Sequence, residues 1–112
     1  MALIKWQTNA KKHMRAISNY YLEQAFKKVA SDFQKTIFDG VEPLEKFPTM
    51  GMKDEELSTP GYELRFLIIK WRKRTYRVYY LYENEICAIL AVWDCSMDPE
   101  KRMQYVIPLH MK

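Results

Sequence analysis

Eight consecutive residues combine a high positive charge with aromatic rings. The octet, residues 70–77, reads Lys70, Trp71, Arg72, Lys73, Arg74, Thr75, Tyr76, Arg77, with five basic residues and two aromatic ones. The whole chain has 18 Lys and Arg against 14 Asp and Glu, so outside the octet 13 basic residues face 14 acidic ones. Because the positive excess is local, it can focus a field that attracts phosphate groups. The alternative is a solvated hairpin tip whose charges keep an edge strand soluble.

Strand alternation places further polar side chains near the octet. Arg77 and Tyr79 point to one side of a predicted strand, and Glu63 and Arg65 point to one side of the preceding strand. If the register of the two strands brings these side chains together, one open sheet face carries two arginines, a carboxylate and a phenol.

The two cysteines are predicted to be reduced thiols. Cys87 and Cys95 lie near the two ends of one predicted strand, and eight extended residues separate them by about 26 Å. That distance excludes a disulfide between them. Reduced cysteines are typical of a cytosolic protein.

We expect no metal and no nucleotide cofactor. The two histidines, His13 and His110, are isolated from each other and from other ligand types. Gly40, Gly51 and Gly61 are scattered, so they cannot form a loop that cradles phosphates.

A membrane location is also not expected. The longest apolar run, Ile86 to Trp93, has eight residues, whereas a membrane-spanning helix needs about 20. The start of the chain, Met1 to Trp6, lacks the layout of a signal peptide. We therefore expect a cytoplasmic protein.

The N-terminal part of the chain is predicted to form a helical hairpin after a short edge strand at Leu3–Trp6. Thr8 can cap a helix from about Asn9 to Glu23. A second periodic stretch begins at Gln24, and Gly40 is expected to interrupt it. Its apolar stripe consists of Phe26, Val29, Ala30, Phe33 and Ile37.

Three strands follow, at Tyr62–Ile69, Thr75–Tyr82 and Ile86–Trp93, and a last short helix opens at Asp98-Pro99. The predicted fold class is α+β, with the N-terminal helical hairpin packed on a four-stranded, mainly antiparallel sheet in a single domain over residues 1–112. The hairpin buries its apolar stripe on one sheet face, which leaves the centre of the other face free for chemistry.

The order of these elements and four short stretches resemble the RelE/ParE superfamily of toxins from bacterial toxin–antitoxin systems. The stretches are Phe47-Pro48-Thr49-Met50-Gly51, Tyr62-Glu63-Leu64-Arg65, Thr75-Tyr76-Arg77-Val78-Tyr79-Tyr80 and Ala91-Val92-Trp93-Asp94-Cys95-Ser96-Met97-Asp98-Pro99. Together they span nearly the whole chain in the order typical of the superfamily.

The resemblance implies the toxin of a type II toxin–antitoxin (plasmid stabilisation) system, neutralised by a cognate antitoxin in a hetero-oligomer, with a homodimer as a further possibility. RelE-like members cut mRNA on the ribosome without a metal, and ParE-like members poison DNA gyrase without a nuclease site. We expect the antitoxin to lay an acidic amphipathic segment over the helical hairpin or the basic sheet face.

For a RelE-like nuclease, the resemblance assigns roles to the polar residues of the two strands. Arg77 would stabilise the crowded phosphate, since an arginine fork holds two phosphate oxygens and keeps its charge. Arg65 would add a second cation, Glu63 would act as general base, and Tyr79 would stack on a base or donate a proton. Lys70, Arg72, Lys73 and Arg74 would bind backbone phosphates of ribosomal RNA or DNA.

Two departures from the RelE-like pattern keep the alternatives open. No basic residue follows the last strand at Asp94 to Met97, and Glu63 stands where the RelE nuclease has a basic residue. The first hypothesis is ribosome-dependent mRNA cleavage by Arg77 and Arg65. The alternatives are a non-enzymatic gyrase inhibitor and a degenerate member that only binds its antitoxin.

Overall fold

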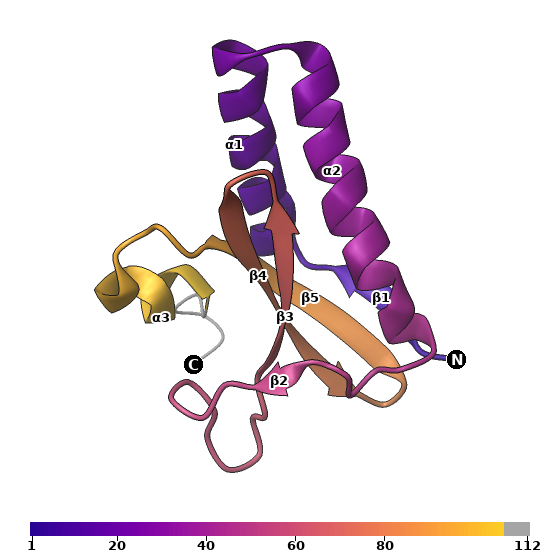
Figure 1. Cartoon of the computed structure of the whole chain (residues 1–112). Coiled ribbons are helices and arrows are strands. Elements are labelled where there is room, and N and C mark those ends of the chain that lie inside the picture. Colours follow the sequence, from indigo (N-terminus) through magenta and orange to yellow (C-terminus); the bar gives the residue numbers. More distant parts are fainter. Residues whose placement is uncertain (107–112) are drawn as a thin grey trace.

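The computed structural model describes residues 1–106, which fold into a five-stranded sheet with helices on both faces (Figure 1). The elements are β1 (Leu3–Trp6), α1 (Thr8–Gln24), α2 (Lys27–Val41), the 3₁₀ helix η1 (Glu42–Glu45), β2 (Met52–Lys53), β3 (Arg65–Trp71), β4 (Arg74–Glu83), β5 (Ile86–Asp94), the 3₁₀ helix η2 (Pro99–Lys101) and α3 (Arg102–Val106). The strand order is β1-β5-β4-β3-β2, with β1 parallel to β5 and the other pairs antiparallel.

The α+β class, the N-terminal helical hairpin and the mainly antiparallel sheet are confirmed, but the number of strands is five rather than four. The additional strand is β2, a two-residue segment in which Met52 pairs with Phe66 and Lys53 with Arg65. Two residues are too few to give a period in the sequence, so this strand could not be found from alternation.

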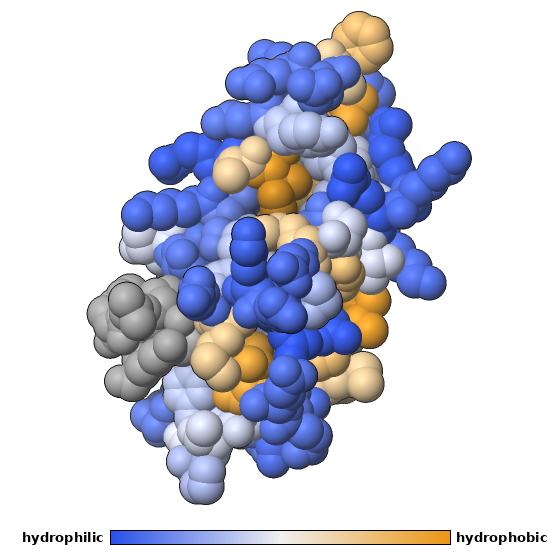
Figure 2. All heavy atoms as spheres, turned by 90° about the vertical axis from the view of Figure 1, so that its left-hand side faces the viewer, coloured by the Kyte–Doolittle hydropathy of each residue, from blue (hydrophilic) through white to orange (hydrophobic). Residues whose placement is uncertain are grey.

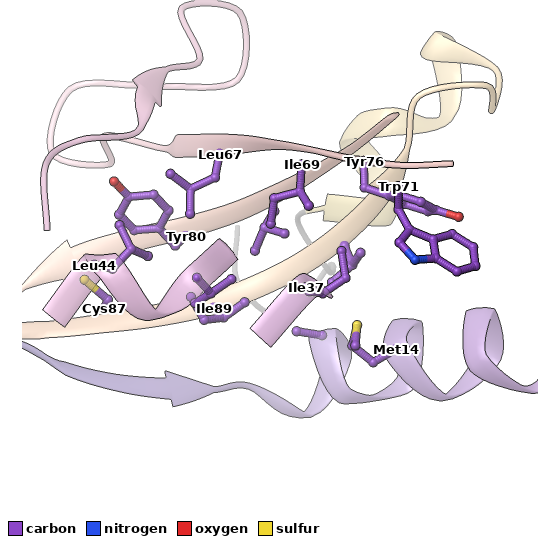
Figure 3. Close-up of a cluster of buried hydrophobic side chains, with 14 of the residues drawn as sticks. Met14, Ile37, Leu44, Leu67, Ile69, Trp71, Tyr76, Tyr80, Cys87 and Ile89 are labelled. Atoms are coloured by element: carbon purple, nitrogen blue, oxygen red, sulfur yellow. The ribbon is translucent and has the colours of Figure 1, made fainter. Parts of the chain in front are cut away.

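The first core lies between the helical hairpin and the sheet (Figure 3). Its side chains come from the inner stripes of α1 and α2 and from alternate positions of β3, β4 and β5. They include Met14, Phe33, Ile37, Leu44, Leu67, Ile69, Trp71, Tyr76, Tyr80, Cys87 and Ile89, all 8% exposed or less. This arrangement confirms that the hairpin packs on one face of the sheet and buries Phe33 and Ile37 of the predicted stripe. Phe26 does not follow the prediction: α2 begins at Lys27 rather than at Gln24, and Phe26, just before it, is 76% exposed.

Two details of the helices differ from the expectation. α1 begins at Thr8 itself, and the residue before it, Gln7, makes no side-chain capping bond. α2 also continues through Gly40 to Val41 instead of ending there. A Cβ atom at Gly40 would lie 2.6 Å from Cδ1 of Ile69, so glycine at this position permits the close approach of α2 to β3.

The second sheet face is not free in its centre, which corrects the sequence prediction. A second core covers it, made of Leu57, Leu64, Phe66, Tyr79, Leu90, Ala91, Trp93 and Val106. The covering segments are α3 and the loop between β2 and β3, on the side of the sheet away from the hairpin (Figure 1). The outer surface on the α3 side is mainly hydrophilic, with smaller apolar areas between charged side chains (Figure 2).

Both cysteines are free thiols, as the sequence predicts, with Cys87 buried in the first core and Cys95 exposed. Within residues 1–106, no helix is long and apolar enough to cross a membrane. His110 lies outside the described residues.

Candidate functional site

Arg77 and Tyr79 lie together on the second face of the sheet. Both side chains emerge from β4, and Nη1 of Arg77 donates a hydrogen bond to Oη of Tyr79 over 3.2 Å. The guanidinium also lies over the ring of Phe66, 4.3 Å from its centroid. Burial raises the pKa of Tyr79, so the phenol stays protonated and donates its hydrogen to Oδ2 of Asp54 over 3.2 Å.

Asp54 is the centre of this network and is only 4% exposed. Its Oδ1 accepts hydrogen bonds from the amides of Glu56 and Leu57, over 3.1 and 2.9 Å. Its Oδ2 lies 3.8 Å from Nη1 of Arg102, whose Nη2 donates to Glu56 over 2.8 Å. The network therefore contains two arginines, two carboxylates and a phenol, and its formal charges balance.

Arg65 lies on the opposite face of the sheet from Arg77. In the ladder between β3 and β4, Arg65 pairs with Tyr80 and Arg77 pairs with Ile68. The ring of Tyr80 lies in the first core, whereas Arg77 lies over the second, so the two arginines diverge. The expected face with both arginines does not form, because the register places them at positions of opposite parity.

The guanidinium of Arg65 holds the loop before β2. Its Nη1 donates to the carbonyls of Thr49 and Gly51, over 3.2 and 2.8 Å. The phenol of Tyr80 secures the same loop, since its Oη accepts from the amide of Gly51 over 2.9 Å and donates to the carbonyl of Pro48 over 2.8 Å. Arg65 thus has a structural function that uses most of its donors.

Glu63 lies beside Arg65 rather than beside Tyr79. Its Oε2 is 3.1 Å from Nη2 of Arg65, and its Oε1 is 3.9 Å from Nζ of Lys53. The carboxylate therefore balances two cations at the edge of the sheet.

The turn between β3 and β4 carries the exposed part of the octet. Arg72 and Lys73 connect the strands, and Arg72 adopts a positive φ of 56°. Its guanidinium lies 4.8 Å from the ring centroid of Trp71, which is itself buried in the first core. Within residues 1–106, neither these two residues nor Lys70 takes part in an ion pair.

Arg74 differs from its neighbours because it has a carboxylate partner. Its Nη1 lies 3.0 Å from Oδ2 of Asp94 and 3.2 Å from Oγ of Ser96. Asp94 raises the pKa of the Arg74 guanidinium. The segment after β5, which lacks a basic residue of its own, therefore binds a cation from the octet.

The family to which the chain belongs follows from a comparison of the sequence. A family profile described as "ParE toxin of type II toxin-antitoxin system, parDE" matches residues 4–99. The chain belongs to the ParE toxin family. The match covers both helices of the hairpin and all five strands except Leu3, the first residue of β1. It confirms the RelE/ParE resemblance and narrows it to the ParE branch.

A solved structure has the fold of this ParE-family toxin. The chain from "Chromosomal ParDE TA system from P. aeruginosa" superposes with a TM-score of 0.68 at 21% identity, covering 84% of this chain and 96% of that chain. At this identity the likeness establishes a shared fold. No curated protein matches the sequence.

Within the ParE-family fold, the predicted site residues fall into three separate groups. Arg77 and Tyr79 are joined on the second face, Arg65 and Glu63 are joined at the sheet edge, and the four cations from Lys70 to Arg74 lie at the turn. Among residues 1–106, no group of three or more His, Cys, Asp or Glu side chains is placed to hold a metal ion.

Sequence reasoning missed Asp54 and Arg102 as partners of the Arg77–Tyr79 pair. Asp54 lies in the charged stretch Lys53-Asp54-Glu55-Glu56, before the first predicted strand of the sheet's antiparallel part. Aspartate is common in tight turns because its side chain can accept from the amides two and three residues later, as Asp54 does. The presence of an aspartate in this loop was therefore the signal that the sequence offered. Arg102 lies 23 residues after Tyr79 in the sequence, and nothing local connects the two.

Proposed function

We propose that this ParE-family chain is a toxin that inhibits DNA gyrase without catalysing a reaction. The observation that carries this proposal is the divergence of Arg65 and Arg77 to opposite faces of the sheet. Metal-free RNA cleavage requires cations that converge on one phosphate, where they stabilise the charge of the transition state. Here each arginine is held by partners within the protein, and the two do not share a site.

The other groups that a nuclease would need are also engaged. The proton of the Tyr79 phenol is donated to Asp54, and Glu63 lies between Arg65 and Lys53. The carboxylate proposed as a base is therefore on the wrong side of the sheet from the phenol proposed as an acid. Membership of the ParE family favours the gyrase target over the ribosome.

A reconstituted assay with two targets tests the proposal. Purified toxin is added to gyrase with relaxed plasmid and ATP, and in parallel to a cell-free translation reaction. We expect loss of supercoiling, with accumulation of cleaved plasmid, at toxin concentrations that leave translation unchanged. Inhibition of translation at a lower toxin concentration than inhibition of supercoiling would contradict the proposal.

The second candidate is ribosome-dependent mRNA cleavage, and one observation favours it. Arg77 is partly exposed and has a phenol 3.2 Å away on the same face, so one cation and one proton donor are adjacent. The variant Arg77→Gln separates the candidates once its thermal stability has been measured. A gyrase inhibitor keeps its inhibition in this variant, whereas a nuclease loses mRNA cleavage by a factor of about 100 or more.

We also propose that an antitoxin neutralises the toxin by binding between α1 and α2. A groove of about 470 Å³ lies there, with Trp6, Met14 and Phe38 among its apolar lining residues and Lys11 and Arg15 among its basic ones. An acidic amphipathic segment fits both properties. The variant Phe38→Glu is expected to lose antitoxin binding and to keep gyrase inhibition, which pull-down with the neighbouring gene product and the supercoiling assay would measure.

A further inference from the structure

The positive charge of the molecule is concentrated at one end of the β3–β4 hairpin. Lys70, Arg72 and Lys73 lie within four residues of one another and are exposed. None of them has an ion-pair partner within residues 1–106. Arg74 adds a fourth cation there, although Asp94 offsets its charge. We call Lys70, Arg72 and Lys73 the basic tip.

The opposite end of the same sheet is acidic on balance, because four glutamates there outnumber Lys5 and Lys46. β4 runs from Arg74 to Glu83, which is about 30 Å of extended chain. At its far end, Glu83 precedes the turn to β5 and Glu85 is part of that turn, and both are exposed. The 3₁₀ helix η1 contains Glu42 and Glu45, and the carbonyl of Glu45 accepts a hydrogen bond from the amide of Ala2. Ala2 precedes β1, which pairs with the start of β5 beside that turn. A separation of charge along the sheet orients the basic tip toward a polyanion.

Arg72 of the basic tip and the neighbouring Arg74 are held in fixed positions. The ring of Trp71 is buried under the helical hairpin and supports the guanidinium of Arg72 at 4.8 Å. On the next strand, Arg74 is fixed by Asp94 and Ser96. Ordered cations lose less conformational entropy on binding phosphates than mobile ones do.

We propose that the basic tip binds the sugar–phosphate backbone of duplex DNA, and so places the toxin against the DNA that gyrase holds. This inference rests on the proposed gyrase target, which makes a DNA duplex the adjacent polyanion. Every side chain of the basic tip is Lys or Arg, and contacts of these side chains with phosphate oxygens carry no sequence information. The binding is therefore independent of sequence and sensitive to salt.

Fluorescence anisotropy with a short labelled duplex, without gyrase, tests the inference. Three phosphate contacts give a slope of about −3 in a plot of log affinity against log salt concentration. We expect binding to weaken by a factor of about 40 between about 50 and about 200 mM salt. A slope near zero, or a matched RNA duplex that binds more tightly than the DNA, would overturn the inference.

A pair of double variants supplies the matched control. Arg72→Gly with Lys73→Ala removes two charges from the basic tip, and glycine suits the positive φ at position 72. Lys5→Ala with Lys46→Ala removes two charges at the acidic end of the sheet. The first variant should bind DNA at least 10-fold more weakly than the wild type, with a slope reduced by about two, and the second should retain most of its affinity. Equal losses in the two variants would contradict the inference.

The result of the DNA-binding test can be distinguished from the result of the test of gyrase inhibition. Supercoiling by gyrase is measured with the same two variants over a range of toxin concentrations. If gyrase is inhibited but the duplex is not bound, the DNA inference fails and the gyrase proposal stands. If the duplex is bound at the basic tip but supercoiling is unaffected, the gyrase proposal fails instead.

Discussion

The main-chain N–H of Val92 donates a hydrogen bond to Nδ1 of His13 over 3.2 Å. β1 pairs with β5 only as far as Ile89, so the edge of β5 beyond this residue has no strand beside it. Side chains from α1 take the place of that strand, because Asn9 donates to the carbonyl of Leu90 and His13 accepts from Val92. One turn of helix thus completes the hydrogen bonding of a strand edge.

The contact between His13 and Val92 predicts a pH dependence of stability. Nδ1 must be unprotonated to accept a hydrogen bond, and burial lowers the pKa of His13 from 6.5 to about 4. Since the unfolded chain binds the proton more readily, this contribution is complete above about pH 6.5 and decreases as the pH falls toward 4. We expect a loss of about 2 kcal/mol between pH 7.5 and 5, measured by urea unfolding.

The variant His13→Gln provides the control for this prediction. Its amide oxygen can accept from Val92 but does not titrate, so the decrease of stability between pH 7.5 and 5 should be smaller than in the wild type by the amount assigned to His13. If the two proteins lose equal stability over this range, the titration of His13 is not the cause.

The contact between Gly40 and Ile69 predicts a second effect on stability. Alanine in a helix is favoured over glycine by about 1 kcal/mol, yet a Cβ at position 40 would lie 2.6 Å from Cδ1 and 3.0 Å from Cγ1 of Ile69. Because Ile69 is buried, we expect Gly40→Ala to destabilise the protein by about 1 to 3 kcal/mol. The same substitution in an Ile69→Val background, which lacks Cδ1, should cost clearly less. A double-mutant cycle from thermal unfolding measures the difference.

The elements that repeat regularly were predictable from the sequence. The apolar stripe of α2 and the alternation of β4 extend over enough residues to give a period. The end of α2 was not predictable, because Gly40 reads as a helix stop when its neighbour Ile69 is unknown. The second core was missed for a similar reason, since the contacts of Val106 with the sheet are far apart in the sequence.

For the candidate site, the sequence predicted which residues of one strand lie side by side, but not which residues of neighbouring strands share a face of the sheet. Residues two apart on one strand were correctly grouped, as with Arg77 and Tyr79. The relation between strands depends on register, and a shift of one residue moves a side chain to the other face. The turn fixes that register, and it places Arg65 opposite Tyr80 instead of on the face of Arg77.

The turn between β4 and β5 predicts a stabilising substitution. Asn84 and Glu85 form its two residues and have φ values of 52° and 63°. A two-residue hairpin turn with both φ values positive favours Asn-Gly, and glycine avoids the steric cost at the second position. Glu85→Gly should therefore raise the free energy of unfolding by about 0.5 to 1 kcal/mol, which urea unfolding measures. Glu83→Gly, within β4, should be destabilising, and a stability gain in that control would point to charge removal as the cause.

The phenol of Tyr80 predicts a loss of stability on removal of a single oxygen. Tyr80→Phe leaves the buried amide of Gly51 without its acceptor and the carbonyl of Pro48 without its donor. An unsatisfied buried group costs about 1 to 3 kcal/mol. Tyr82→Phe changes an exposed phenol, 37% exposed, and should have little effect. Comparison of the two unfolding midpoints in urea tests whether the loop before β2 depends on Tyr80.

Asp54 is expected to be the most sensitive polar position of the second face. Asp54→Ala removes the acceptor for the amides of Glu56 and Leu57 and for the phenol of Tyr79, and it leaves Arg102 with one carboxylate. We expect a destabilisation of about 2 to 4 kcal/mol in urea unfolding. Asp54→Asn retains Oδ1 for the two amides and should cost less.

A double-mutant cycle distinguishes the hydrogen bond between Tyr79 and Asp54 from a general effect of the loop. Tyr79→Phe removes the hydroxyl group that donates a hydrogen bond to Oδ2 of Asp54 and accepts one from Nη1 of Arg77. If the phenol and the carboxylate stabilise each other, Tyr79→Phe costs less in the Asp54→Ala background than in the wild type, by about 0.5 to 2 kcal/mol. Additive costs would mean that Asp54 acts only through the turn at Glu56 and Leu57, where its Oδ1 accepts from the two amides.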